Sequence, residues 1–164
     1  LSLRRQRQMC IRDRKNVDLT VVGPEAPLVD GIVDIFNENN LKIFGPGKKA
    51  AQLEGSKNFC KEILNLGNIP TAKHMSFSDS ISAINYVKNK KMPIVVKADG
   101  LAAGKGVFIL ENKEEACKLI NDLFTGKIDG IKTSLIIVED FLKGEEASFI
   151  CLVSGDTVLS LIHI

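Results

Sequence analysis

The sequence lacks several features that would mark particular classes of protein. It contains no apolar run that approaches the roughly 18 residues of a membrane-spanning helix, so we expect no membrane partner. Its arginine-rich start has no apolar core of the kind that a secretory signal peptide carries. The four cysteines, at positions 10, 60, 117 and 151, are spaced too widely for a zinc site or a thiol redox pair. These absences predict a cytoplasmic protein whose cysteines are free thiols.

Arginine is also absent from most of the chain. All five arginines lie within the first 14 residues, and the rest of the chain has 17 lysines, 19 acidic residues and no arginine. The formal net charge of +2 therefore comes from the start alone, and we expect no nucleic-acid partner. Because residue usage changes so sharply there, and because the chain stops within an apparent strand, we expect residues 1–14 and 159–164 to be a non-native head and tail.

The pattern of apolar residues predicts an α/β unit in the first third of the chain. Residues 17–22 form a short apolar run that ends at a Gly-Pro pair, which is typical of a buried parallel strand. Residues 26–39 place their apolar side chains on one helical stripe, and residues 42–44 indicate a second strand. A strand–helix–strand unit of this length implies a right-handed crossover in an open parallel sheet.

The remainder predicts a mixture of helices and strands. We expect helices over residues 56–66, 78–89 and 112–124, and strands over 93–98, 107–110, 135–139, 146–153 and from 157 onward. Gly67 is expected to end the first helix, while Asn112 and Glu115 form a capping-box pattern at the start of the third. Residues 68–71 indicate a linker, and His74 is expected to be a surface or linker residue. The buried positions predicted in the second helix are Ile81, Ile84, Tyr86 and Val87.

A glycine-rich loop between two predicted strands is the most informative segment. It lies within Ile94–Val107, IVVKADGLAAGKGV, and its glycines are Gly100, Gly104 and Gly106. Glycines allow positive φ and a close backbone approach, so the loop can fold over a polyanion with its N–H groups pointing inward. Lys97 and Lys105 add charge that can meet phosphate oxygens. A mobile hairpin tip with a solvated lysine is the alternative that this segment alone leaves open.

Two common phosphate-binding motifs do not fit this loop. A P-loop has four residues between its first glycine and its Gly-Lys pair, followed by serine or threonine, whereas Gly100 and Gly104 are separated by three. A dinucleotide-binding loop opens a helix, whereas this loop leads into the apolar strand that begins at Val107. The segment therefore predicts a flap that covers phosphates from above.

A second polar segment follows the strand predicted at 135–139. In Ile136–Phe149, IIVEDFLKGEEASF, two acidic residues end the strand and two more follow a turn. An adenine ring needs backbone hydrogen-bonding groups at its edge and apolar walls on its faces, and a connection of this kind can supply both. A carboxylate a few residues later can accept hydrogen bonds from ribose hydroxyls. A surface turn with solvated acids is the alternative.

Four strings, taken together, resemble the ATP-grasp fold and more closely the phosphoribosylamine–glycine ligase (GAR synthetase) family. They are VVGPEAPLVDG (21–31), IFGPGKKAAQLEGSK (43–57), VVKADGLAAGKGV (95–107) and VEDFLKGEEASF (138–149). The resemblance covers about residues 16 to 158. It implies an internal fragment of mixed α/β and α+β class. The end of an open parallel-sheet domain with its linker (15–73) precedes the small ATP-grasp subdomain with its flap (74–140) and the start of the large one (141–158).

The resemblance also implies a set of site residues. The ATP-binding residues would be Lys57, Lys97, Gly104, Lys105, Gly106, Glu139, Phe141, Leu142 and Glu146. In that set the first two lysines would contact phosphates, residues 104–106 would form the flap, and backbone groups of Glu139 and Leu142 would meet adenine. Phe141 would lie beside the adenine, and Glu146 would hold the ribose. The substrate-binding residues would be Gly23, Pro24 and Glu25, near phosphoribosylamine.

The activity implied by the resemblance is the ATP-dependent joining of glycine to 5-phosphoribosylamine, which gives glycinamide ribonucleotide, ADP and phosphate in purine biosynthesis. Glycine and phosphoribosylamine are the expected small-molecule partners. ATP and Mg²⁺ are the expected cofactors, with the magnesium ligands beyond the end of this chain. No Ser-His-Asp or Cys-His set is needed for such chemistry. Because the family's opening strand and its later parts are missing, we expect the 164-residue polypeptide as written to be inactive.

Three other functions remain as alternatives. Another ATP-grasp carboxylate–amine ligase, or a biotin-dependent carboxylase, would share the flap and would be separated by a panel of acid and amine substrates. A non-catalytic nucleotide-binding module would bind ATP without turnover. A dinucleotide-binding oxidoreductase domain would bind a nicotinamide cofactor, but it needs a glycine loop that opens a helix.

Overall fold

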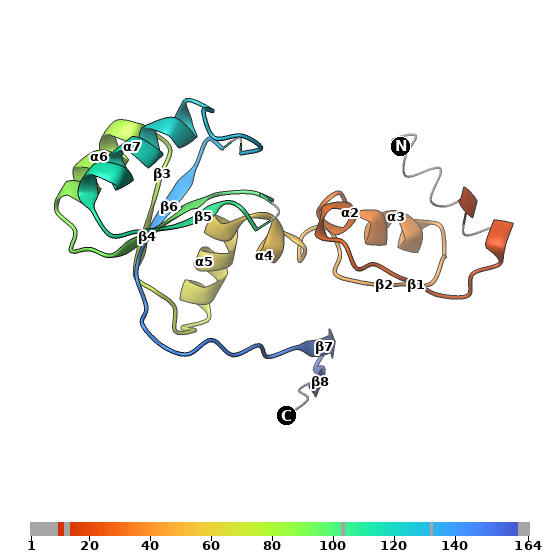
Figure 1. The fold of residues 1–164 in the computed structure, drawn as a ribbon. Helices are drawn as coiled ribbons and strands as arrows, with labels where there is room; N and C mark the ends of the chain where they lie inside the picture. The colour runs from red at the N-terminus through yellow and green to blue at the C-terminus, as the bar shows by residue number, and fades with distance from the viewer. Residues whose placement is uncertain (1–9, 12–13, 103, 132, 161–164) are drawn as a thin grey trace.

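The computed structural model describes residues 10–11, 14–102, 104–131 and 133–160. Its first part is a small α/β unit in which β1 (Thr20–Val21) pairs in parallel with β2 (Ile43–Phe44). Helices α2 (Glu25–Val29) and α3 (Ile32–Glu38) connect the two strands (Figure 1). Parallel pairing was predicted for these strands and is confirmed, although only two residues of the run 17–22 are paired. The expected burial of this run is wrong, since Leu19 and Val21 are exposed.

The single helix expected over residues 26–39 is wrong, because the chain forms two helices there. The break falls at Gly31, which has a φ of 89° and is the N-cap residue of α3. That left-handed conformation is open to glycine but strained for residues with a side chain. The apolar stripe is shared between the two helices, since Leu28 of α2 packs against the buried Val33 and Phe36 of α3.

Two helices lead from this unit toward the rest of the protein. The short α4 (Gln52–Gly55) was not predicted, whereas α5 (Lys57–Leu66) matches the expected helix. Ser56 caps α5, because its side chain accepts a hydrogen bond from the backbone N–H of the third helical residue. Gly67 is the C-cap as expected, but it stays right-handed with a φ of −81°. The left-handed residue is instead Asn68, at a φ of 52°.

A four-stranded antiparallel sheet forms the second part of the protein. Its strands are β3 (His74–Phe77), β4 (Ile94–Ala98), β5 (Val107–Leu110) and β6 (Ile136–Asp140), in the spatial order β3-β6-β4-β5. The expectation that His74 lies in a linker or on the surface is wrong, since it is half-buried and opens a strand that pairs with β6. The residues of β3 show only a weak strand pattern in the sequence, and the strand depends on its pairing with β6.

Two helices, α6 (Ser80–Lys88) and α7 (Lys113–Phe124), cover one face of this sheet, while α5 lies on the other side (Figure 1). The fully buried side chains between α6, α7 and the sheet are Ala83, Val87, Ile94, Val96, Ala98, Ala116, Ile120 and Ile136. The cap predicted for α7 is confirmed, because Asn112 accepts a hydrogen bond from the N–H of Glu115 at 2.8 Å. The prediction that Ile81 is buried is wrong, because its side chain is 73% exposed and turns away from the sheet.

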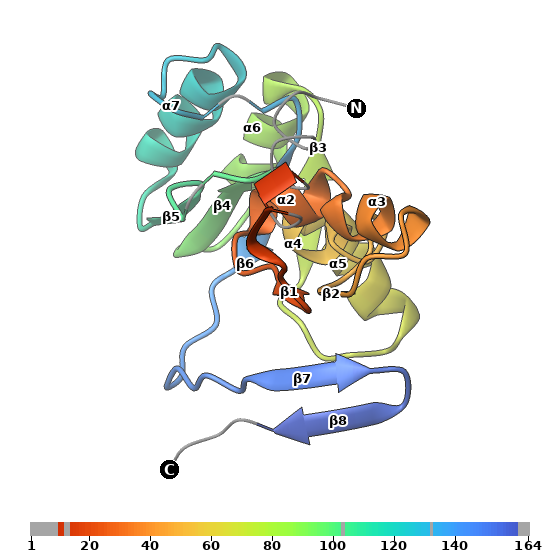
Figure 2. The ribbon, with the colours of Figure 1, turned by 90° about the vertical axis from the view of Figure 1, so that its right-hand side faces the viewer.

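The last described residues form a hairpin of β7 (Cys151–Ser154) and β8 (Thr157–Ser160) about Gly155, which has a φ of 55°. The hairpin stands apart from the sheet and its helices (Figure 2). The strand expected to begin at Glu146 begins only at Cys151, which pairs with the last described residue, Ser160. Within the described ranges, no helix has both the length and the apolar character needed to cross a membrane.

Candidate functional site

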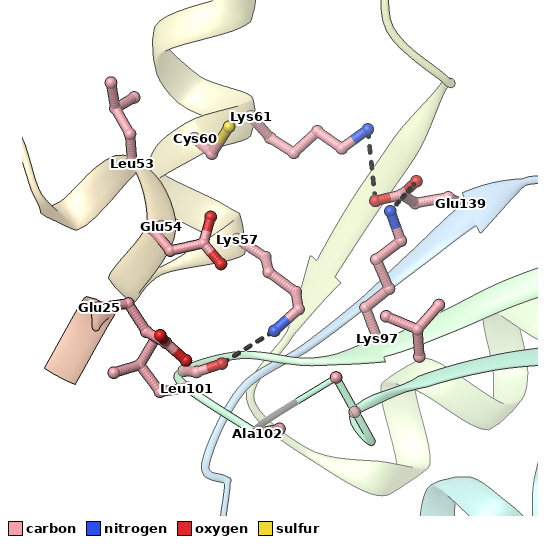
Figure 3. A pocket seen from close by; sticks show the side chains of 14 residues that line it. Glu25, Leu53, Glu54, Lys57, Cys60, Lys61, Lys97, Leu101, Ala102 and Glu139 are labelled. Carbon is pink, nitrogen blue, oxygen red and sulfur yellow. Dashed lines mark hydrogen bonds and ion pairs between the residues drawn. The ribbon is translucent and has the colours of Figure 1, made fainter. Parts of the chain in front are cut away.

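A pocket of about 350 Å³ lies where the glycine loop, helix α5 and the α5-facing side of the sheet meet (Figure 3). Its charged lining consists of Glu25, Glu54, Lys57, Lys61, Lys97 and Glu139. Glu25 and Glu54 are exposed, and they lie on the side of α2 and α4. The remaining four come from α5 and from two neighbouring strands, so the pocket combines residues far apart in sequence.

Strand register brings Lys97 and Glu139 to the same face of the sheet. Val95 is paired with Glu139, and Lys97 is paired with Ile137, so all four of these residues share one face. The alternating residues of the same strands, among them Val96, pack in the core under α6 and α7. The side chain of Glu139 is therefore buried beneath α5, with 5% of its surface exposed.

Glu139 is held between two lysines. Its Oε2 lies 3.0 Å from the Nζ of Lys97, and its Oε1 lies 3.3 Å from the Nζ of Lys61. Lys61 is itself buried and donates a hydrogen bond of 2.6 Å to the hydroxyl of Thr71. The contact between Oε1 and Lys61 is an ion pair without an aligned hydrogen bond. One carboxylate thus serves two ammonium groups at the wall of the pocket.

Lys57 enters the pocket one helical turn before Lys61, because residues four apart lie on the same face of a helix. Its Nζ donates a hydrogen bond of 2.8 Å to the carbonyl oxygen of Gly100, at the start of the glycine loop. Lys57, Lys61 and Lys97 therefore line one pocket, with the ammonium groups of the last two on the same carboxylate (Figure 3). The lining holds as many glutamates as lysines, so an anionic ligand would be favoured by direct contact with the lysine ammonium groups rather than by net charge.

Asp99 connects the end of β4 to the start of α5. Its carboxylate accepts hydrogen bonds from the Ser56 hydroxyl, at 3.1 and 3.2 Å, and from the backbone N–H of Asn58 at 3.1 Å. An acidic side chain at a helix N-terminus satisfies backbone donors that have no partner within the helix. This connection fixes Lys57, the first residue of α5, relative to the loop that follows Asp99.

The glycine loop joins two antiparallel strands, as predicted. Gly100 and Gly104 have φ values of 93° and 77°, which favour glycine. Gly106 is required for a different reason, because a Cβ there would lie 2.8 Å from the Cβ of Ala102. The backbone N–H of Lys105 donates a hydrogen bond of 2.8 Å to the carbonyl of Ala102, which closes the turn.

The structure brings together about half of the predicted site. Lys57, Lys97, Gly104, Gly106, Glu139 and Glu25 line the pocket. Lys105, Phe141, Leu142 and Glu146 are exposed and are not part of its lining. Gly23 and Pro24 lie instead in a separate cavity of about 440 Å³ beside β1, with largely apolar walls.

Sequence reasoning missed Lys61 and Asp99. The spacing of four residues between Lys57 and Lys61 was a signal that both lie on one face of the predicted helix. Pairing of Lys61 with Glu139 could not be found in this way, because the two residues are 78 positions apart. Asp99 carried no signal of its own beyond its place after a strand.

The end of β6 is held by a second ion pair. The Nζ of Lys90 lies 2.7 Å from Oδ1 of Asp140 and 4.9 Å from the centre of the Tyr86 ring. The hydrogen bond to Asp140 raises the pKa of Lys90 above its ordinary value of 10.5. This pair anchors the strand directly before Phe141.

No group of three or more His, Cys, Asp or Glu side chains among the described residues is arranged to hold a metal ion. The buried carboxylate of the pocket, Glu139, is already paired with two lysines. Among the residues that the structure describes, we therefore assign no magnesium ligand.

Solved structures of several enzymes share this fold. D-alanine–D-alanine ligase from Bacillus anthracis, in a complex with ATP, superimposes with a TM-score of 0.61 at 20% identity, over 96% of this chain and 52% of that one. The biotin carboxylase domain of Hydrogenobacter thermophilus 2-oxoglutarate carboxylase, solved with MgADP, gives a TM-score of 0.70 at 19% identity, over 86% and 32% of the two chains. The glycine-loop hairpin and its sheet thus belong to a fold that these enzymes share.

Sequence comparison specifies the family. Residues 55–164 match the profile of the phosphoribosylglycinamide synthetase ATP-grasp (A) domain, and residues 4–54 match that of its N domain. The chain therefore belongs to the phosphoribosylglycinamide synthetase family.

Curated relatives named phosphoribosylamine–glycine ligase are 53% identical over 146 residues in Yersinia pestis and 52% identical over 147 residues in Escherichia coli O157:H7. These matches cover 89% and 90% of this chain, which spans 34% of each relative. The solved phosphoribosylamine–glycine ligase of Thermotoga maritima is 37% identical with a TM-score of 0.69, over 73% of this chain and 31% of that one.

Proposed function

We propose that this chain is the nucleotide-binding part of a phosphoribosylamine–glycine ligase. The observation that carries the proposal is the pocket beside the glycine-rich loop, which is lined by Lys57 of α5 and Lys97 of β4. Membership of the family supports it, as do the names of relatives more than 50% identical to this chain. The chain spans about a third of those relatives, so the activity of the whole protein is part of the proposal.

In this proposal the polyphosphate of ATP lies in the pocket, between the two lysines and the flap. Lys57 now donates to the carbonyl of Gly100, and Lys97 is paired with Glu139. Both ammonium groups keep further donors free for phosphate oxygens, since an ammonium group has three. Gly104 and Gly106 allow the flap backbone to approach the phosphates, with Lys105 at its tip.

Adenosine would lie toward the segment that follows β6. We assign the adenine edge to the backbone of Glu139 and Leu142, with Phe141 beside the ring and Glu146 on the ribose. The exposure of Phe141, Leu142 and Glu146 leaves their side chains and backbone accessible to such a ligand. Gly23, Pro24 and Glu25 would contact phosphoribosylamine, and Glu25 already reaches the pocket. Residues 141–158 would begin the large subdomain.

The reaction would run in two steps. A carboxylate oxygen of glycine attacks the γ-phosphorus of ATP, the bond to the β,γ-bridging oxygen breaks, and glycyl phosphate and ADP form. The amine of 5-phosphoribosylamine then attacks the acyl carbon, phosphate leaves, and the amine loses a proton, which gives glycinamide ribonucleotide. The residues of this chain would contribute positioning and positive charge at the phosphates rather than a covalent nucleophile.

The proposal is tested by nucleotide affinity and by turnover in the full-length protein. Lys97→Ala should weaken ATP binding by about tenfold to a hundredfold, the range that corresponds to one charge-assisted hydrogen bond. Lys118→Ala is the matched control, because Lys118 is an exposed lysine of α7 outside the pocket. Equal effects of the two substitutions on ATP affinity would contradict the assignment of the pocket.

Substrate identity needs a separate experiment. ADP formation by the full-length protein should require both glycine and phosphoribosylamine, and a panel of other acids and amines should give far slower turnover. A preference for another acid would indicate a different carboxylate–amine ligase with the same nucleotide site. The 164-residue chain on its own should show no glycine-dependent ADP formation.

A further inference from the structure

The pocket contains a lysine that the proposed function does not use. Lys61 is 7% exposed, yet it lines the same pocket as Lys57 and Lys97. Burying an ammonium group is costly unless a partner compensates its charge. Its partners are the carboxylate of Glu139 at 3.3 Å and the hydroxyl of Thr71 at 2.6 Å. Of these two, only Glu139 carries a charge.

The same carboxylate also contacts Lys97, so its single negative charge is shared. The two oxygens of Glu139 face different lysines, Oε1 toward Lys61 and Oε2 toward Lys97. The trio of two ammonium groups and one carboxylate has a formal charge of +1. If Lys61 were absent, Glu139 and Lys97 would neutralise each other, and the trio would contribute no net charge to the pocket.

The difference between a formal charge of +1 and one of zero has a larger electrostatic effect because these side chains are buried. Glu139 and Lys61 have 5% and 9% of their side-chain surfaces exposed, whereas Lys97 has 26% and faces the pocket. Charges removed from water interact more strongly, because the surrounding medium screens them less. The other acids of the lining, Glu25 and Glu54, are exposed and therefore better screened. Glu139 is the acid best placed to compete with a phosphate for Lys97.

We propose that Lys61 is a positioning residue for the nucleotide site: it compensates the charge of Glu139, so that Lys97 remains available to an anionic polyphosphate. Lys61 acts through Glu139 and does not itself need to touch the ligand. This inference rests on the proposed nucleotide site, but it assigns a role to a residue that the site does not otherwise require. A lysine with a purely structural role would support folding without changing how the pocket distinguishes phosphates.

The test measures the dissociation constants of ATP and of adenosine in the full-length protein. Adenosine lacks the phosphates, so its affinity should not depend on Lys97. Lys61→Met keeps an unbranched apolar side chain and should weaken ATP by at least about tenfold while adenosine changes by less than about twofold. Lys118→Met, on the exposed face of α7, is the matched control and should change neither constant.

A second variant separates positioning from simple support. In Lys61→Met/Glu139→Gln the competing carboxylate is gone, so Lys97 is free again, and ATP affinity should return to within about threefold of the unmodified protein. Lys61→Arg keeps the charge and should preserve the preference for ATP over adenosine. If Lys61→Met does not fold, the double variant and Lys61→Arg still test the positioning role of Lys61.

Each remaining outcome overturns a defined part of the reasoning. Unchanged ATP affinity in Lys61→Met, equal losses for ATP and adenosine, or no recovery in Lys61→Met/Glu139→Gln would each overturn the positioning role. Failure of the proposed function is seen elsewhere, because an unmodified protein that binds neither ATP nor adenosine has no nucleotide site. The two failures are therefore distinguishable in one set of measurements.

Discussion

The buried carboxylate of Glu139 should be one of the most sensitive positions for stability. Glu139→Gln keeps the size and shape of the side chain but removes the negative charge between Lys61 and Lys97. Lys97 can recover hydration, because 26% of its side chain is exposed. Lys61 cannot, because its residue is 7% exposed and its remaining partner is the neutral Thr71 hydroxyl.

The magnitude follows from this difference in exposure. Removing one partner of a buried ion pair costs about 3–5 kcal/mol, because the other charge stays buried without compensation. The hydrogen bond to Thr71 and the exposure of Lys97 favour the lower end, about 3 kcal/mol. For a chain of this size, about 2–4 °C per kcal/mol translates this into a fall of about 6–12 °C in melting temperature.

The assay is thermal unfolding of the chain followed by circular dichroism, with Asp140→Asn as the matched control. Asp140 is the next residue of the same strand and is also paired with a lysine, but 41% of its side chain is exposed. Exposed ion pairs contribute about 0–1 kcal/mol, so the control should lower the melting temperature by no more than about 4 °C. Equal shifts in the two variants would refute the argument from burial.

Two further predictions concern the helices and the alkaline range. Asn112→Ala should lower the free energy of unfolding by about 1 kcal/mol, because the backbone N–H of Glu115 loses its hydrogen-bond acceptor. Urea unfolding measures this change, with Asn112→Ser as the control because serine keeps a capping oxygen. Lys90 has a folded pKa raised by Asp140, so its contribution to stability is complete below its ordinary pKa of 10.5 and is lost as pH rises through the higher folded value. The difference in melting temperature between the unmodified chain and Lys90→Met should therefore shrink as the pH rises above 10.5. A difference that stays constant there would contradict the assignment.

Local signals in the sequence predicted much of the fold. A hairpin could be predicted from the glycine-rich loop between two apolar runs, and the structure confirms it. The prediction needed only the conformational freedom of the glycines and the two strands on either side of them. The cap at Asn112 and the helix it starts were found for the same reason, since a capping side chain acts within three residues. The family was also accessible from four short strings, which the profile matches confirm.

Features that depend on distant partners were missed or placed wrongly. Strand β3 has a weak pattern of its own and exists because β6 offers it a paired edge. Ile81 looked buried from helical spacing, but the direction in which α6 faces the sheet leaves it exposed. Gly31 looked like a helical residue, although its positive φ divides the helix in two.

The sequence by itself determined the glycine-rich loop between two strands, the lysines in and beside that loop, and the strings of one ligase family. Only the tertiary structure decided which charges meet. Lys61 and Glu139 are joined because α5 crosses the face of the sheet on which Val95, Lys97 and Glu139 lie. Side-chain direction along a strand alternates locally, but the partner across the pocket is set by packing. Charge compensation in a buried site is therefore a property of the assembled fold.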